Sequence, residues 1–151
     1  MSEPDLSRAL RWVFLKLRRN ILSKFQEAGV PLNPPDAHML EMLEIEPGLS
    51  PQDLARLSGI DKAYITRRVR ELETHGLICR CRDEQDQRRF RLYLNTDGLQ
   101  TMNRAQELIH QCEEEMFAPL DPADRQTLTT LLAKCLKKDD ETPSQQIPRR
   151  A

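Results

Sequence analysis

The sequence predicts a mainly α-helical (α+β) fold, in which a lobe of short helices and one two-stranded β-hairpin is flanked by longer helices at both ends. Residues 50–76 carry start and stop signals for two short helices, and residues 77–94 have the pattern of two strands around a polar tip. Apolar residues also recur at helical spacing in both end regions. At 151 residues the chain fits a single domain, residues 1–151.

The first 30 residues predict a helix with a broad apolar surface. Apolar residues recur at helical spacing from Leu6 to Phe25, and Trp12, Leu15 and Leu22 widen the stripe. One small domain cannot cover so wide a surface. We therefore expect this helix to pack on its own domain and on a second copy of the chain.

The other end region, residues 96–138, predicts two more apolar helices. Asn95 can cap the first, and Asp121, followed by a proline, can start the second. Apolar regions at both ends of a lobe are what a two-fold dimer requires, so residues 1–30 and 96–138 are predicted to be dimerisation helices. Residues 139–151 lack periodicity and contain two prolines, and we expect a disordered tail there.

Within the lobe, residues 33–95, the strongest local signals define two helices separated by a glycine turn. Ser50 can cap the first helix, with Asp53 three residues later as in a capping box. Gly59 can end that helix, and an aspartate then caps a second helix over residues 61–75. Two helices joined by a short glycine turn form a helix-turn-helix unit.

The second of these helices carries a face that suits the major groove of DNA. Ile65, Val69 and Leu72 fall on one stripe and are expected to face the core. Arginine can donate two hydrogen bonds to guanine, threonine can contact a base, and alanine permits close approach. A merely solvated face is the alternative for this helix taken alone. The outward residues are Ala63, Tyr64, Thr66, Arg67, Arg70 and Thr74.

The hairpin over residues 77–94 strengthens the DNA interpretation. Its second strand alternates apolar with polar residues, and a polar loop separates the two strands. A hairpin that follows a recognition helix forms a wing, whose tip can enter the adjacent minor groove. We expect Arg88 to make that contact with Arg89 beside it, and Asp86 to hold the Arg88 guanidinium by a charge-assisted hydrogen bond.

Positive charge is concentrated in this part of the chain. The net charge of the whole chain is −1, whereas residues 61–91 contain nine Lys and Arg against six Asp and Glu, a net charge of +3. Such a segment is the electrostatic footprint of a nucleic-acid-binding element. Because the excess is modest, we expect two copies to act together.

The sequence gives little support to other classes of function. No apolar run reaches the roughly 20 residues of a membrane span, and no signal sequence is recognisable, so we expect a cytoplasmic protein without a membrane partner. Glycine-rich phosphate loops, paired histidines and a nucleophile–base set are all missing from the sequence. We therefore expect neither an enzyme nor a bound cofactor or metal ion.

Motifs at the wing carry a resemblance to a known family. Gly76-Leu77-Ile78, Asp86-x-Arg88 and Leu92-x-Leu94-Asn95-x-x-Gly98 have the spacing found in the MarR family of bacterial winged helix-turn-helix transcription factors. Leu92 replaces a usual valine and Asn95 a usual threonine. Arg68 is a departure, because the family usually has an apolar residue there. The resemblance extends over about residues 6–138.

This resemblance implies a homodimeric regulator that binds pseudo-palindromic double-stranded DNA in a bacterial cytoplasm and associates with the nucleoid when bound. We expect a repressor that a small anionic effector, an aromatic or phenolic acid, releases from DNA. Arg11, Trp12 and His38 could line the effector site. The DNA contacts we expect are Lys62 and Arg68 on phosphates, Tyr64, Thr66, Arg67 and Arg70 on bases or backbone, and Asp86, Arg88 and Arg89 on the wing.

Two alternative functions remain open. Cys79 and Cys81 point to the same face of a strand, which predicts packing under the wing or, alternatively, a thiol-based sensor of oxidative stress. Oxidant sensors of the family usually carry the reactive cysteine in the first helix, which has none here. The other alternative is a winged-helix interaction module that binds an acidic protein and not DNA.

Overall fold

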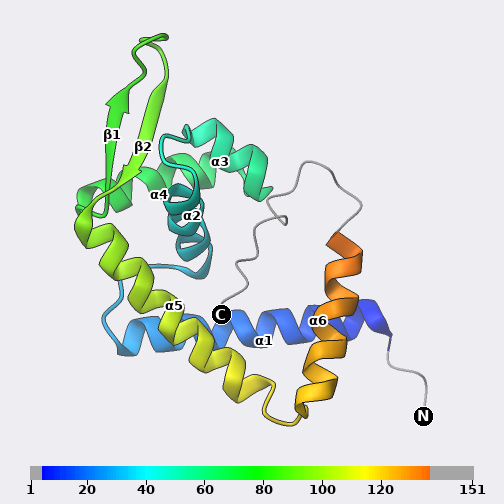
Figure 1. Cartoon of the computed structure of the whole chain (residues 1–151). Coiled ribbons are helices and arrows are strands. Elements are labelled where there is room, and N and C mark those ends of the chain that lie inside the picture. The colour runs from blue at the N-terminus through cyan, green and yellow to red at the C-terminus, as the bar shows by residue number, and fades with distance from the viewer. Residues whose placement is uncertain (1–4, 137–151) are drawn as a thin grey trace. The chain divides into compact units, whose positions relative to one another are not determined.

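The computed structural model describes residues 5–136, and these form six helices and one two-stranded sheet (Figure 1). The predicted tail, residues 139–151, lies outside the described residues. The chain divides into one compact unit that ends at Met116 and a second that begins at Phe117. The elements are α1 (Leu6–Glu27), α2 (Pro34–Ile45), α3 (Pro51–Ser58), α4 (Lys62–Thr74), β1 (Ile78–Arg82), β2 (Phe90–Leu94), α5 (Thr96–Met116) and α6 (Pro122–Leu136).

The start and stop signals of the helix-turn-helix unit are confirmed. The Ser50 hydroxyl accepts a hydrogen bond from the Asp53 backbone N–H at 3.1 Å, and the Asp53 carboxylate accepts from the Ser50 N–H at 2.9 Å. Gly59 ends α3 with φ of +67°, a conformation that glycine adopts at little cost. Asp61 caps α4 by accepting from the Tyr64 backbone N–H at 3.1 Å.

The core of the first unit lies between α2, α3, α4, the sheet and α5. The predicted stripe of α4 is buried, since Ile65, Val69 and Leu72 are at most 2% exposed. Apolar side chains of α2 and of β2 close the same core, which Ile21 and Phe25 extend onto the last turns of α1. Because its apolar stripe is buried in this core, α4 keeps one face inward and leaves the opposite face to solvent.

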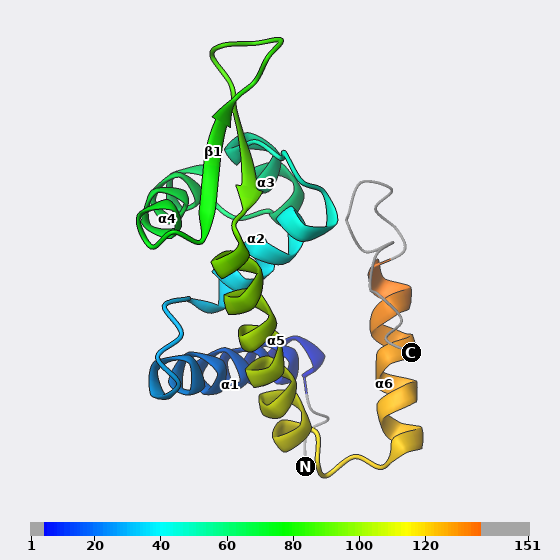
Figure 2. The same cartoon turned by 60° about the vertical axis from the view of Figure 1, so that its left-hand side comes forward.

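The sheet is an antiparallel hairpin that projects from the helical lobe (Figure 2). Its register pairs Ile78 with Leu94 and Arg82 with Phe90. The loop before α3 adds backbone bonds to β2, because the Leu92 carbonyl accepts from the Gly48 N–H at 2.9 Å and the Leu92 N–H donates to the Leu49 carbonyl at 3.0 Å. The base of the wing is thereby attached to the helix-turn-helix unit.

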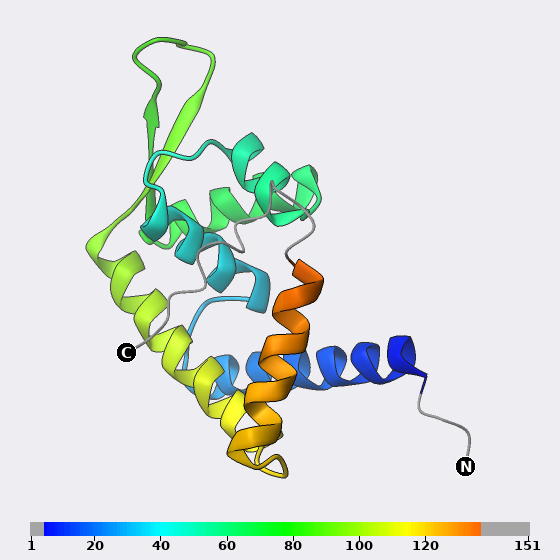
Figure 3. The ribbon, with the colours of Figure 1, turned by 45° about the vertical axis from the view of Figure 1, so that its right-hand side comes forward.

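The N-terminal turns of α1 differ from its C-terminal turns. They extend away from α2 and α5 (Figure 3). Lys24, near the other end, forms an ion pair with Glu115 at 2.9 Å. Apolar side chains along these turns are exposed: Leu6, Leu10, Trp12, Val13, Phe14 and Leu15. This surface matches the broad apolar stripe expected from the sequence, and the fold of the unit leaves it uncovered.

Between Phe117 and residue 136, the second unit contains one helix, α6. Asp121 caps α6 as predicted, because its carboxylate accepts from the Asp124 N–H at 2.8 Å. Between residues 5 and 136, every helix is too short or too polar to cross a membrane.

Candidate nucleic-acid interface

The outer face of α4 presents a row of cations that form no ion pair within residues 5–136, although Asp61 and Glu71 lie at its borders. Lys62, Arg67 and Arg70 are exposed, and none of the ion pairs among residues 5–136 includes them. Together with Ala63 and Thr66 they line one shallow hollow on the surface. Cations that are left unpaired on a fixed helix face are available to phosphates and base edges.

Two local contacts orient the polar side chains of this face. The Arg67 guanidinium lies over the Tyr64 ring, 5.4 Å from its centroid, which restricts the arginine without using its N–H donors. The Thr66 hydroxyl donates to the Lys62 carbonyl at 2.9 Å. The hydroxyl oxygen of Thr66 therefore remains available as an acceptor, and its methyl group remains available for apolar contact.

The wing continues the cationic surface. Arg88, Arg89 and Lys62 line a groove that also borders the start of α3. The expected Asp86–Arg88 side-chain bond is wrong: the Asp86 carboxylate accepts from the Arg88 backbone N–H at 3.0 Å and lies 3.6 Å from the Arg89 Nε. The Arg88 side chain is exposed, because the tight turn brings its backbone to Asp86 and directs its guanidinium to solvent.

Asp83 organises the wing tip and was not identified from the sequence. This buried carboxylate accepts from the Gln85 N–H at 2.8 Å and from the Arg91 Nε at 2.9 Å. These bonds, first the backbone N–H of Gln85 and then the Arg91 guanidinium, hold the pKa of Asp83 below its ordinary value. An aspartate that precedes a polar loop is a known turn signal, and it could have indicated this position.

Another arginine, Arg80, links the wing to α4. Arg80 on β1 donates to the Glu73 carboxylate at 2.8 Å, and its guanidinium lies 4.9 Å from the centroid of the Phe90 ring. Contacts to both α4 and β2 fix the direction of the wing relative to the recognition helix. Arg80 is therefore structural in this chain, although its sequence context is as basic as that of the exposed arginines.

Arg68 is the other correction at this site. Its guanidinium donates to the Asp36 carboxylate on α2 at 3.0 and 2.7 Å and also pairs with Glu71. The side chain is only 11% exposed. The predicted phosphate contact of Arg68 is wrong, because a buried carboxylate already occupies its donors. Sequence reasoning had no way to pair two residues that are 32 positions apart.

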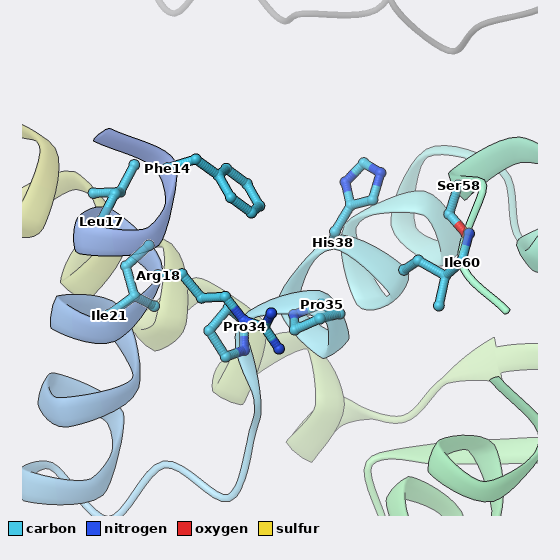
Figure 4. A pocket seen from close by; sticks show the side chains of 9 residues that line it. All are labelled: Phe14, Leu17, Arg18, Ile21, Pro34, Pro35, His38, Ser58 and Ile60. Atoms are coloured by element: carbon cyan, nitrogen blue, oxygen red, sulfur yellow. The ribbon is translucent and has the colours of Figure 1, made fainter. Parts of the chain in front are cut away.

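A cavity of about 410 Å³ lies between α1, α2 and the turn that joins α3 to α4. Phe14 and Arg18 of α1 lie on one side of it, across from His38 and Ile60 (Figure 4). His38 lines the cavity as expected, whereas Arg11 and Trp12 do not. Arg11 shares a helix face with Arg18 but precedes it by about 10 Å, whereas Trp12 lies on the side of α1 opposite Ile21.

Cys79 of β1 does not have the environment of a reactive thiol. Cys79 is half-buried and Cys81 is exposed. Burial, and secondarily the neighbouring Cys81, raises the pKa of the Cys79 thiol, which lowers the fraction of nucleophilic thiolate. The part of the chain that the structure describes contains no cluster of three or more potential metal ligands.

Comparisons with known proteins agree with this geometry. A family model described as MarR family matches residues 32–90. The chain is 34% identical over 106 residues to a putative transcriptional regulatory protein for the hcr operon of Thauera aromatica, a match that covers 70% of this chain and 64% of that protein. It is 30% identical over 125 residues to the HTH-type transcriptional regulator BilQ of Clostridium symbiosum, covering 77% of this chain and 85% of BilQ.

Among solved structures, the transcriptional repressor CouR bound to a 23-mer DNA duplex superimposes with a TM-score of 0.78 at 28% identity. The superposition covers 87% of this chain and 92% of CouR. Like the two relatives, CouR is named as a regulator and not as an enzyme, in agreement with the expectation that this chain has no enzymatic activity.

Proposed function

Because the chain belongs to the MarR family of winged helix-turn-helix proteins, we propose that it is a homodimeric regulator that represses transcription by binding pseudo-palindromic operator DNA. The observation that carries this proposal is the outer face of α4. Arg67 and Arg70 are exposed and unpaired within residues 5–136, on a helix whose opposite face is buried. A rigid helix with such a face suits insertion into the major groove.

The proposed roles of the side chains follow from their positions. Arg67 and Arg70, with Thr66 and Tyr64, contact base edges or the adjoining backbone, and Lys62 contacts phosphate. Arg88, with Arg89 beside it, reaches the minor groove from the wing. Two copies joined through their end helices hold two α4 helices about 34 Å apart, so they read successive major grooves.

Selection of bound duplexes from a random pool tests this proposal. The selected sequences should contain two inverted half-sites separated by about one helical turn. Arg67→Ala should relax sequence preference at one position of each half-site and cost about 1–3 kcal/mol, whereas Lys62→Ala should weaken binding to every duplex alike.

Three results would contradict it. Failure of the protein to enrich any duplex would exclude DNA binding. Equal losses for Arg67→Ala and Lys62→Ala on all duplexes would exclude base reading by Arg67. Binding of an acidic protein by the same arginines, without DNA binding, would favour the interaction module instead.

We also propose that a small aromatic acid binds in the cavity between α1 and α2 and releases the DNA. The cavity has the volume of a small-molecule site and is predominantly apolar, and Arg18 supplies one cation for a carboxylate. Calorimetric titration with salicylate should show binding that Arg18→Met weakens about tenfold. The exposed Arg8→Met variant is the control, and no heat of binding at millimolar salicylate would refute this choice of ligand.

A further inference from the structure

A buried ion pair joins the recognition helix to α2. The Arg68 Nε donates to Asp36 Oδ1 at 3.0 Å and Nη2 donates to Oδ2 at 2.7 Å, which makes a two-bond fork between the helices. Asp36 is 0% exposed and the Arg68 side chain is 11% exposed. A fork of this kind fixes the plane and the distance of both groups more strictly than apolar packing does.

Each half of the pair is anchored on its own helix. Asp36 is the third residue of α2, and its carboxylate also accepts from the Asn33 N–H at 2.6 Å. Arg68 pairs in addition with Glu71, one turn later on α4. The rotation of α4 is therefore set against the N-terminus of α2.

The position of Arg68 on α4 makes this rotation matter for DNA. Arg67 and Arg70 are one and two residues away, so the angle of the fork about the helix axis determines the direction of both reading side chains. Ile65, Val69 and Leu72 bury the inner face and set the rotation of α4 only within the width of their apolar stripe, since the hydrophobic effect is not directional. Replacing a buried ion pair by apolar side chains is often neutral for stability, and in some proteins buried polar groups fix one arrangement of the helices.

We infer that Arg68 is a positioning residue, which sets the rotation of α4 for base reading through its fork to Asp36 and makes no contact with DNA itself. This inference rests on the proposed function. The first turns of α2, which carry Asp36, also present Pro35 and His38 to the cavity. The carboxylate that sets the rotation of α4 therefore belongs to the wall of the cavity.

The double variant Asp36→Asn/Arg68→Met tests the inference, with the duplex that the wild-type protein selects and a scrambled duplex of equal length. The introduced asparagine retains an acceptor for the Asn33 N–H, and the double change avoids leaving a buried carboxylate without its cation. We expect the melting temperature to stay close to that of the wild type, while affinity for the selected duplex falls about tenfold. Affinity for the scrambled duplex and the salt dependence on both duplexes should not change.

A phosphate contact gives a different result. Loss of one such contact weakens binding to both duplexes equally and lowers the salt slope by about 1. Arg68→Lys separates the two roles further, because lysine can contact phosphate but cannot form the fork. Arg104→Met, an exposed change on α5, is the control and should leave both affinities unaltered.

Several outcomes would overturn the inference. Wild-type discrimination in the double variant and in Arg68→Lys would refute positioning and leave the proposed function intact. A reduced salt slope would replace positioning by phosphate contact. If the double variant fails to fold, Arg68→Lys, which keeps a cation beside Asp36, decides the matter by the same two affinities. Failure of the wild-type protein to select any duplex would refute the proposed function, and this inference with it.

Discussion

The helix-turn-helix lobe and the N-terminal turns of α1 use apolar residues in opposite ways. In the lobe, Leu40, Leu54 and Ile65 are 0% exposed, whereas on α1 Leu6 is 80% exposed and Trp12 is 64% exposed. The lobe covers its own apolar surface within one chain. The first turns of α1 present a large apolar surface that no element of the first unit covers.

This difference indicates that the two regions depend on different partners. Large contiguous apolar patches on a protein surface mark sites of association, and a second copy of the chain is the partner that the dimer proposal supplies. The lobe should therefore respond to mutation by losing stability, and α1 by losing association. Each of the following predictions tests one side of this contrast.

Gly98→Ala should have the largest effect, at the junction of the lobe and α5. A Cβ at Gly98 would lie 1.9 Å from the Leu77 carbonyl oxygen, and backbone cannot move aside cheaply. We expect a loss of about 3 kcal/mol or more in the free energy of unfolding, measured by urea denaturation. Gly59→Ala is the control: a Cβ there meets nothing within 4 Å, so its left-handed backbone should cost only about 1 kcal/mol. Equal losses would refute the close approach.

Leu10→Asp should separate association from folding. A charge in the exposed apolar surface of α1 should convert the dimer to a monomer at micromolar concentration, seen by sedimentation equilibrium. Affinity for a two-half-site duplex should fall about a hundredfold, because the second half-site is no longer bound by a linked copy. Ile45→Asp, the same kind of change at an exposed position on α2 and outside the predicted dimerisation helices, is the control. A dimeric Leu10→Asp protein would place the interface elsewhere.

Acid should loosen the tip of the wing, at a pH below the ordinary pKa of an aspartate. The folded-state pKa of Asp83 is held below its ordinary value near 3.9, so the stabilisation by this carboxylate is complete above that pH and is lost as pH falls through the folded-state pKa. The carboxyl carbon of Asp83 and the amide of Gln85, followed by NMR, should report the same titration. Asp83→Asn should abolish the acid transition at Gln85 while leaving the amides of α1 unchanged. A titration of Asp83 at its ordinary pKa would contradict the bonds from Gln85 and Arg91.

The smallest expected effect concerns the thiols of the wing. Because the pKa of Cys79 is raised by burial, thiolate is scarce at neutral pH, and treatment with micromolar peroxide should not change DNA affinity. Cys79→Ser should behave as the wild-type protein does. Release of DNA by peroxide that Cys79→Ser abolishes would support the alternative of an oxidant sensor.

The helices of the lobe could be predicted because their start and stop signals act over short stretches of sequence. The Ser50–Asp53 capping box, the left-handed Gly59 and the Asp61 cap act within a few residues, so neighbouring sequence is sufficient to place α3 and α4. The outward face of α4 follows from helical periodicity alone, and that is why Thr66, Arg67 and Arg70 were placed correctly on the surface.

Two of the errors, at Arg68 and Arg88, concern which partner an arginine finds. Arg68 and Arg67 are neighbours in the sequence, yet one binds a buried carboxylate on α2 and the other faces solvent. Arg88 and Arg91 on the wing are likewise distinguished by a contact of Arg91 alone with Asp83. Both members of each pair are arginines in an equally charged stretch of sequence. The charge pattern therefore could not show which arginine is paired and which is exposed.

By itself, the sequence determined the order of elements, the helix ends and the two faces of α4, because caps, glycine conformations and periodicity act over fewer than ten residues. The tertiary structure decided which cations are free, which turn of α1 borders the cavity, and how Asp83 and Asp36 each hold an arginine. Those outcomes depend on distances between elements that are remote in sequence, and only the packed fold sets such distances.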